Sequence, residues 1–254
     1  MRILFVDKVK KPATVITSIN ETPGYPASNL ASDFLNEQYI SIFPDDVITI
    51  DLGADTELNC VFLAYLNAAV FDIEIRNNAS SVVYTQASYS NSRPVLPIYL
   101  GSIVTGRYIE ISADASLGLA SFIDTDVDMG LYLKMKGLGS GVYFETEDGG
   151  PLNGHDLSIF SETTSLRSKT GQIISTQFPF LAARKWDFGA QTYAMVQIFL
   201  TNLKLLGLQN PTYMDFFPDT LEYDDPIYCA ITKVTGPKRS GVEFTYSFEI
   251  QEAR

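Results

Sequence analysis

The chain has 254 residues, and its 18 basic and 30 acidic side chains give a formal net charge of −12 at neutral pH. This charge disfavours binding to the phosphate backbone of nucleic acids and to anionic membranes. The length exceeds the ~100–150 residues of a typical domain and predicts two domains, or one domain with a large extension. Aromatic residues make up 12% of the chain, with 14 Tyr and 16 Phe, which suits β-rich packing.

No signal peptide and no insertion into a membrane are predicted. Residues 1–6 are a short apolar run without a small-residue cleavage site behind them, and we expect them to form the first strand. The most apolar segment, residues 195–206, is interrupted by polar residues and is too short to span a bilayer. Cys60 and Cys229 have apolar or aromatic neighbours, which predicts two buried free thiols and fits a protein made in the cytoplasm.

Residues 1–115 consist of short alternating runs bounded by Gly, Pro, Asn and Ser, the pattern of a β-sandwich. In residues 47–51 and 71–76 apolar and polar side chains alternate, which predicts strands with one buried face. Residues 61–66 are continuously apolar and are predicted to be a strand buried on both faces. Asn77 then predicts a turn, because asparagine tolerates left-handed backbone.

The next segment, residues 116–130, is rich in small and acidic side chains, and we place a domain boundary there. Beyond it, residues 131–136 and 141–145 are predicted to be strands separated by a glycine-rich turn at 137–141. A further strand pair is predicted around residues 171–178 and 183–188.

One amphipathic helix is predicted from Thr192 to Leu206, with Gly207 as its C-terminal cap. Its apolar face is made by residues at intervals of three and four: Tyr193, Val196, Phe199, Leu200, Leu203 and Leu206. Two alternating segments, residues 223–231 and 242–250, are predicted to be antiparallel strands joined across Gly236 and Pro237.

The predicted fold class is therefore mainly β. A jelly-roll β-sandwich is expected in residues 1–120, and a second β-rich domain with one amphipathic helix near 191–206 is expected in residues 121–254.

Three segments of the first domain carry a resemblance to a known family: YPASNL at 25–30, VITIDLG at 47–53 and GRYIEI at 106–111. They resemble the galactose-binding-like β-sandwich of the discoidin family, in which an Asn-Leu loop precedes an IDLG strand and a late GRYIxI strand closes the sheet. Family members usually carry a Trp near the first long loop, where this chain has Tyr39.

The resemblance implies a ligand site on the loops at one end of the sandwich. The carbohydrate-binding residues that it implies are Tyr25, Asn36, Gln38, Tyr39, Tyr89, Asn91 and Arg93. Packing of these tyrosines in the core or in an interface is the alternative.

About the last 90 residues resemble, in the order of their elements, the β-domains of tailed-phage tail and baseplate proteins. The order is a strand containing Arg184 and Trp186, a helix, a proline-rich crossing, a DPIYCAI strand and a terminal FTYSFEIQEAR strand. The resemblance implies a structural protein of a tail tip or baseplate, located in the virion tail and made in the host cytoplasm. Known distal tail proteins carry the ring-forming domain first, whereas here the order is reversed.

The partners implied by this second resemblance are further copies of the chain in a closed ring, other tail proteins, and host-surface glycans contacted by the sandwich. Symmetric rings bury large apolar patches. The candidate interface residues are Trp186, Tyr213, Phe216 and Phe217.

No cofactor is predicted. Asp124, Asp126 and Asp128 alternate in a loop and are weak candidates for a Ca²⁺ site, but Met135 stands where an EF-hand needs a glutamate. A solvated acidic linker is the alternative. Discoidin-like sandwiches often hold a structural Ca²⁺ near their first long loop, which implies Ser28, Asn29 and Asp33 as the positions to inspect.

Catalysis is not predicted either. His155 is the only histidine, and without a serine elbow or a nearby cysteine it cannot build a catalytic triad. The main hypothesis is therefore a self-assembling structural component of a phage or phage-like tail tip, which presents a carbohydrate-binding-like module. The alternative is a freestanding carbohydrate-binding module or lectin without catalytic activity, and an enzyme comes third.

Overall fold

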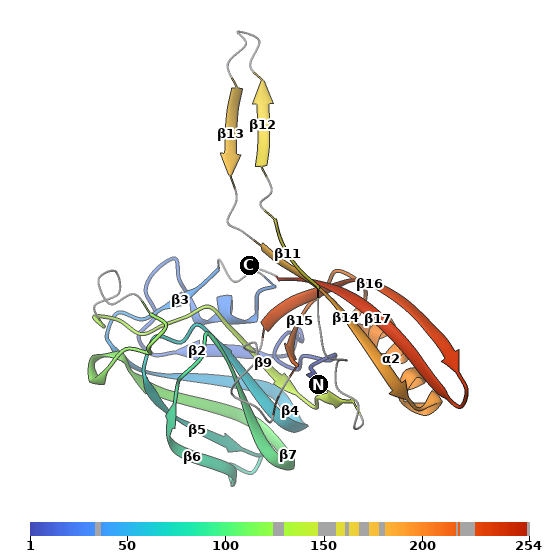
Figure 1. The fold of residues 1–254 in the computed structure, drawn as a ribbon. Helices are drawn as coiled ribbons and strands as arrows, with labels where there is room; N and C mark the ends of the chain where they lie inside the picture. Colours follow the sequence, from blue (N-terminus) through green and yellow to red (C-terminus); the bar gives the residue numbers. More distant parts are fainter. Residues whose placement is uncertain are drawn as a thin grey trace. The chain divides into compact units, whose positions relative to one another are not determined.

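The computed structural model describes residues 1–33, 37–123, 130–146, 156–160, 163–167, 173–177, 181–216, 218 and 227–252. The protein is mainly β and divides into two compact units (Figure 1). Unit 1 comprises Met1–Glu145 and Thr212–Tyr228, and unit 2 comprises Thr146–Pro211 and Cys229–Ala253.

The elements of unit 1 are β1 (Arg2–Ile3), β2 (Val15–Ser18), the 3-10 helix η1 (Ala27–Ala31), β3 (Tyr39–Ile40), β4 (Asp45–Ala64), β5 (Val70–Arg76), β6 (Val82–Ser90), β7 (Val95–Asp114), the 3-10 helix η2 (Ala115–Leu117), β8 (Lys134–Met135), β9 (Gly137–Gly141), β10 (Phe144–Glu145) and β15 (Pro211–Asp215, from Thr212 on). The elements of unit 2 are β11 (Asp156–Phe160), β12 (Thr163–Arg167), β13 (Ile173–Gln177), β14 (Leu181–Gln191), α2 (Tyr193–Leu206), β16 (Ile227–Ser240, from Cys229 on) and β17 (Glu243–Glu252).

Unit 1 is organised by two long strands, β4 and β7, which pair antiparallel over most of their length (Figure 1). The first half of β4 and the last half of β7 belong to a layer in the order β2-β4-β7-β5-β6. The second half of β4 pairs with the start of β7 on one side and with β9 on the other. The predicted strands at 47–51 and 61–66 are thus parts of one strand, with register shifts between Asp51 and Thr56 and between Leu58 and Cys60.

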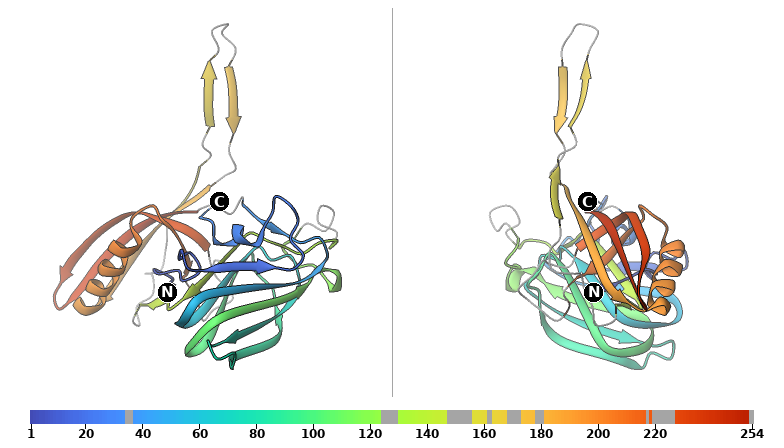
Figure 2. Two further views of the ribbon diagram at one scale, coloured as in Figure 1. Left: turned by 180° about the vertical axis from the view of Figure 1, so that it is seen from behind. Right: turned by 45° about the vertical axis from the view of Figure 1, so that its right-hand side comes forward.

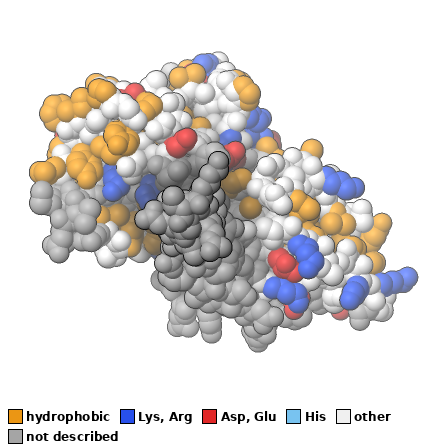
Figure 3. Space-filling model, turned by 90° about the horizontal axis from the view of Figure 1, so that it is seen from above, with side chains coloured by type: hydrophobic (Ala, Val, Ile, Leu, Met, Phe, Trp, Pro, Cys, Tyr) orange, Lys and Arg blue, Asp and Glu red, His pale blue; other side chains and the backbone are white. Residues whose placement is uncertain are grey.

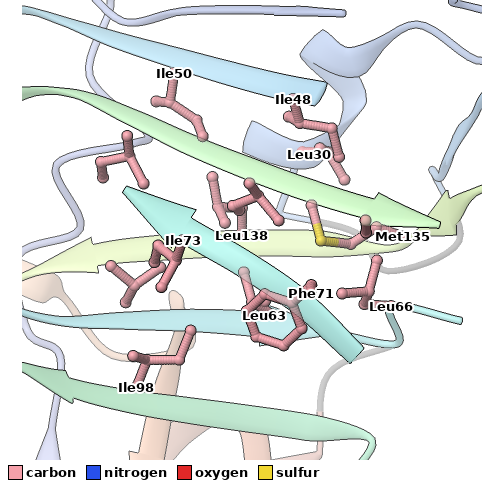
Figure 4. Packing of buried hydrophobic residues seen from close by; sticks show 14 of the residues in the cluster. Leu30, Ile48, Ile50, Leu63, Leu66, Phe71, Ile73, Ile98, Met135 and Leu138 are labelled. Atoms are coloured by element: carbon pink, nitrogen blue, oxygen red, sulfur yellow. The ribbon is translucent and has the colours of Figure 1, made fainter. Parts of the chain in front are cut away.

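The core of unit 1 lies between this layer and the one formed by the second half of β4, the start of β7 and β9. Ile48 and Ile73 come from one layer and Leu63 and Leu138 from the other, and their side chains point into the same space (Figure 4). The register shift between Leu58 and Cys60 changes which residues of β4 face this core, from even to odd numbers. A bulge has this effect because side chains alternate along a strand.

The second half of β4 is buried on both faces, as its continuous apolar sequence predicts. Val61 and Leu63 belong to the core cluster, while Phe62 points to the other side and stacks on Tyr213 with ring centroids 5.1 Å apart. Cys60 is also fully buried, and Cys60 and Cys229 are both free thiols, which confirms that prediction.

The glycine-rich segment 137–141 is a buried strand, so the prediction of a turn there is wrong. It is β9, and it pairs with the second half of β4. The missing side chains make room for neighbours: a Cβ atom on Gly139 would lie 2.5 Å from Cε2 of Tyr213. Glycine can therefore mark close packing inside a sheet as well as a turn.

The family-like segments 47–53 and 106–111 meet through an ion pair. Arg107 Nε and Nη2 donate to the two carboxylate oxygens of Asp51 at 2.7 and 2.9 Å, and Arg107 Nη1 donates to Asn78 Oδ1 at 2.6 Å. Asp51 Oδ1 also accepts from the amide of Gly53. The hydrogen bonds from Arg107 lower the pKa of the Asp51 carboxyl.

Replacing Arg107 by glutamine should therefore raise the pKa of Asp51 toward its ordinary value, as followed by NMR titration of the carboxyl carbon. A lowered pKa stabilises the fold above the carboxyl's ordinary pKa, and this contribution is lost as pH falls through the folded value. The Arg107→Gln variant should lose this contribution to stability. Arg76→Gln is the matched control, because Arg76 pairs with Glu74 and Glu110. An unchanged Asp51 titration in Arg107→Gln would contradict the role of the pair.

The division of the chain differs from the predicted boundary at residue 120. Residues 134–145 belong to unit 1, because β8 pairs with β3 and β9 pairs with β4. Residues 212–228 also belong to unit 1. The predicted first strand is short, and β1 pairs with β10 and β15 rather than with the sandwich layers.

In unit 2 a sheet in the order β16-β17-β14-β11 carries α2 on one face (Figure 2). The helix begins after Thr192, whose hydroxyl accepts from the amide of Met195, and ends at Gly207, which confirms the predicted helix. Phe199 holds the helix to the sheet, with ring centroids 4.9 Å from Tyr246 and 5.9 Å from Phe248. In the described part of the chain, no helix is long and apolar enough to cross a membrane.

Two strand pairings in unit 2 differ from prediction. The strand β13 pairs with β12, and β14 pairs with β11 and β17, so the predicted pair around 171–178 and 183–188 is wrong. The terminal hairpin of β16 and β17 turns at Gly241 and Val242 rather than at Gly236 and Pro237. Gly236 and Pro237 lie inside β16 at a register shift, where a proline without an N–H is tolerated.

Candidate functional site

A cleft of about 510 Å³ lies at one end of the sandwich in unit 1. It forms where β4 and β5 begin and β7 ends, with Asp45 opposite Asp114 and Phe71 opposite Ala113 in the pairing of the strands. The segments after β2 and β7 and the end of β6 complete it. The lining residues are Ile19, Asn20, Asp45, Asp46, Val47, Ala69, Val70, Phe71, Asp72, Ser88, Ser112, Ala113, Asp114, Leu117 and Gly118.

The polar part of the cleft is acidic. It contains the carboxylates of Asp45, Asp46, Asp72 and Asp114, and none of its lining residues is Lys, Arg or His. Asp45 and Asp72 are exposed, and Asp114 is half-buried. A cleft lined by one sign of charge attracts ligands of the opposite sign and repels ligands of its own sign.

The apolar part of the cleft consists of exposed aliphatic side chains. Ile19 is 89% exposed, Leu117 is 86% exposed and Val70 is 48% exposed. Hydrophobic side chains are also exposed elsewhere on the molecule (Figure 3), but these three line the same cleft as the carboxylates. Exposed apolar side chains gathered beside polar groups are typical of a ligand or interaction site.

A buried hydrogen-bond network positions one wall of the cleft. Asp46 accepts hydrogen bonds from the hydroxyls of Ser18 and Tyr39 and from the amide of Val47. Tyr39 itself is fully buried, and burial raises the pKa of its phenol. The prediction that Tyr39 offers its ring to a sugar is therefore wrong, because the ring is in the core and the hydroxyl holds Asp46.

Asn91 has a similar supporting role. It is 4% exposed, and its Nδ2 donates to the carbonyls of Leu66 and Ala68 at 2.6 and 2.9 Å. Its main-chain amide donates to the main-chain carbonyl of Ala69. These bonds fix the loop that leads into β5 and so place Val70. Asn91 is thus a positioning residue for the wall of the cleft, and the prediction that it contacts a ligand directly is wrong.

The other predicted ligand residues that the structure describes do not line the cleft. Tyr25 is 42% exposed. Gln38 is half-buried, and its main-chain carbonyl accepts a hydrogen bond from Asn29 Nδ2. Tyr89 is half-buried and stacks on Phe71, with ring centroids 5.4 Å apart, so it backs a lining residue. Arg93 is half-buried and does not line the cleft. Asn36 lies outside the described residues.

Two of the predicted interface residues are buried within unit 1. Tyr213 is 2% exposed and packs between Phe62 and Tyr228, and Phe216 is 1% exposed. They stabilise the unit itself, so their prediction as exposed interface residues is wrong. Phe217 and the side chain of Trp186 lie outside the described residues.

The predicted metal positions offer no site where they are described. Asp33 accepts from Lys10 Nζ at 2.6 Å, and Asn29 donates to Gln38. Among the residues that the structure describes, no group of three or more His, Cys, Asp or Glu side chains could hold a metal ion. Asp124, Asp126, Asp128 and His155 lie outside them.

The sequence reasoning missed the lining carboxylates. Asp45, Asp72 and Asp114 lie at or next to strand ends, and the register of three strands brings them together. In the structure Asp45 is the first residue of β4 and Asp114 the last of β7, whereas Asp72 is a polar position inside the alternating segment of β5. The proximity of the three carboxylates can be predicted only when the pairing of β4, β5 and β7 is known.

Unit 1 thus has the layers of a β-sandwich with a cleft at one end. The chain is similar to chitosan-binding module 1 of a chitosanase/glucanase from Paenibacillus sp. IK-5, with 14% identity over 54% of this chain and 99% of that one and a TM-score of 0.42. It is similar to the fucose-binding module SpX-3 of Streptococcus pneumoniae, with 14% identity over 55% and 99% and a TM-score of 0.43.

A third similar structure is CpGH89CBM32-5 from Clostridium perfringens in complex with GalNAc-β-1,3-galactose, with 10% identity, coverage of 54% and 100%, and a TM-score of 0.42. No protein-family model matches the chain, and no curated protein matches it.

Proposed function

We propose that unit 1 is a non-catalytic, galactose-binding-like module, and that its cleft binds a neutral or amine-bearing carbohydrate. The observation that carries this proposal is a cleft of about 510 Å³ that is lined both by carboxylates and by exposed aliphatic side chains. The meeting of the family-like segments through Asp51 and Arg107 adds support for the fold type.

The chemistry of the lining suits a sugar. A sugar ring presents C–H groups on its faces and hydroxyl groups around its edge. The C–H groups would pack on Val70, Ile19 and Leu117, and the hydroxyls would donate to carboxylates, which are strong acceptors. A protonated amino group would gain further from the negative charge, whereas a carboxylated or sulfated sugar would be repelled.

Isothermal titration calorimetry with three groups of oligosaccharides tests this proposal: neutral hexose oligomers, glucosamine oligomers and sialylated oligomers. Binding is expected for the first two groups and not for the third. Val70→Arg places a long cationic side chain in the cleft and should weaken binding at least tenfold, which corresponds to about 1.4 kcal/mol.

Val82→Arg is the matched control, because Val82 is 50% exposed in β6, close to the 48% of Val70, but does not line the cleft. It should bind as the unmodified chain does. Failure of every neutral and amine-bearing oligosaccharide to bind would contradict the proposal, as would equal effects of the two substitutions.

We infer a second candidate function, a subunit of a self-assembling tail-tip or baseplate structure in the virion tail, from features of unit 2. The exposed face of α2 carries three apolar side chains, Ala194, Ile198 and Leu205, with the polar Thr201 between the last two. Ile198 is 50% exposed and Leu205 is 71% exposed. In the described part of the chain, β12 and β13 pair with each other alone, and two-stranded hairpins are marginally stable without a partner.

Analytical ultracentrifugation over a range of concentrations tests this second candidate. A ring of fixed subunit number is expected, and Ile198→Lys with Leu205→Lys should reduce it to monomer. A monomer at all concentrations, with and without neighbouring tail proteins, would contradict it.

A further inference from the structure

The segment that joins β1 to β2 contains a half-buried aspartate, Asp7. Its Oδ1 accepts from the amides of Val9 and Ser140 at 3.0 and 3.1 Å. Its Oδ2 is buried and has no hydrogen-bond partner among the residues that the structure describes. A buried, ionised oxygen without a donor is costly, because water is removed from it and nothing replaces the lost hydrogen bonds.

The surroundings of Asp7 Oδ2 are crowded. A Cβ atom on Gly139 would lie 3.0 Å from Asp7 Oδ2 and 2.7 Å from Cδ2 of Tyr213, which places the carboxylate and the ring on the same side of β9. Tyr213 in turn stacks on Phe62. An oxygen packed in this way can be relieved by taking up a proton.

The titratable and charged groups that act on Asp7 come from several elements of unit 1. Lys10 lies in the same segment, and its Nζ donates to Asp33 Oδ1 and to the hydroxyl of Tyr228, both at 2.6 Å. Lys10 favours the ionised form of Asp7 and Asp33 opposes it. The remaining groups are Cys60 of β4, Tyr213 of β15 and Tyr228 of β16. Burial outweighs the favourable contacts and raises the pKa of Asp7 to about 6.

We propose that Asp7 is a pH-dependent latch, which holds residues 4–10 against β9 and β15 more firmly at mildly acidic pH than at neutral pH. When Asp7 is protonated, Oδ2 becomes a neutral hydroxyl while Oδ1 keeps its two backbone hydrogen bonds. The same segment is tied down by Lys8, whose amide donates to Ser140 at 2.7 Å, and by Leu4, whose amide donates to Tyr213 at 3.0 Å. Ionisation therefore favours opening of the whole segment.

The direction of the pH dependence of closing follows from proton linkage. The carboxyl binds its proton more tightly in the closed segment than in an opened one, so closing is favoured below the ordinary pKa of the carboxyl, and this advantage is lost as pH rises through about 6. Between about pH 5 and about pH 7.5 the population of the opened segment should rise about tenfold.

Hydrogen exchange measured by NMR at these two pH values, corrected for intrinsic exchange rates, tests the proposal. The amides of Lys8, Val9 and Ser140 should lose about tenfold in protection at the higher pH. Asp7→Asn should remove this pH dependence, whereas Asp33→Asn, at a side chain that is 57% exposed, should keep it.

Equal protection of wild type at both pH values, or a full tenfold change in Asp7→Asn, would overturn the latch. Titration of the Asp7 carboxyl carbon in the unmodified chain gives an answer that does not depend on any variant folding. A midpoint near 6 supports the proposal, and a midpoint near the ordinary value of about 3.9 overturns it.

Discussion

Replacing Phe62 by alanine is expected to destabilise unit 1 by about 3–5 kcal/mol, the range for removing a buried phenylalanine ring. Phe62 is fully buried, stacks on Tyr213 at 5.1 Å and meets Tyr99 edge-on at 6.4 Å. Gly139 is its neighbour across the pairing of β4 and β9 and has no side chain to fill the space. The cavity would therefore stay open.

Urea unfolding with two probes measures this effect. Circular dichroism follows both units, whereas fluorescence of Trp186, the only tryptophan of the chain, reports on unit 2. Phe43→Ala is the control, because Phe43 is 54% exposed and its loss should change stability by less than about 0.5 kcal/mol. Similar midpoints for the two variants would show that the stack of Phe62 and Tyr213 is not a major support of unit 1.

Gly141→Ala is the second large effect, with an expected cost of about 3 kcal/mol at the upper end of the range for overpacking. The added Cβ would lie 2.6 Å from the carbonyl oxygen of Val6 and 2.9 Å from Cδ1 of Leu4. A backbone oxygen cannot rotate away as a side chain can. Relief therefore requires the segment of residues 4–10 to move off β9.

Gly24→Ala separates this clash from ordinary backbone strain. Gly24 has a φ of +91° but open space where the Cβ would lie, so its cost should be only about 1 kcal/mol. Differential scanning calorimetry of both variants compares them directly. A Gly141→Ala variant as stable as Gly24→Ala would mean that β9 and residues 4–10 are not packed as described.

Local patterns were sufficient to predict several elements. The alternation of residues 71–76 gave β5, the continuous apolar run at 61–66 gave a strand buried on both faces, and the spacing of Val196, Phe199 and Leu203 gave α2. In each case the signal is the local order of apolar and polar residues, which depends only on neighbouring residues.

Features that depend on distant partners were not predictable in this way. Segment 137–141 has the composition of a turn, and only the rings and backbone packed against Gly139 and Gly141 explain it as a strand. The sequence predicts Tyr39 as an aromatic residue of a loop, whereas in the structure its hydroxyl donates a hydrogen bond to Asp46 in the core. The cleft itself arises from the register of β4, β5 and β7, which alternation along one strand does not specify.

The most direct test of the account is an NMR titration of ¹⁵N-labelled protein with the oligosaccharide that binds tightest in calorimetry. We expect the largest amide shifts at the cleft, in residues 45–47, 70–72 and 112–114, with none of similar size in α2 or β17. Saturable binding whose largest shifts fall on unit 2, or on unit 1 away from the cleft, would contradict the assignment of the cleft as the ligand site.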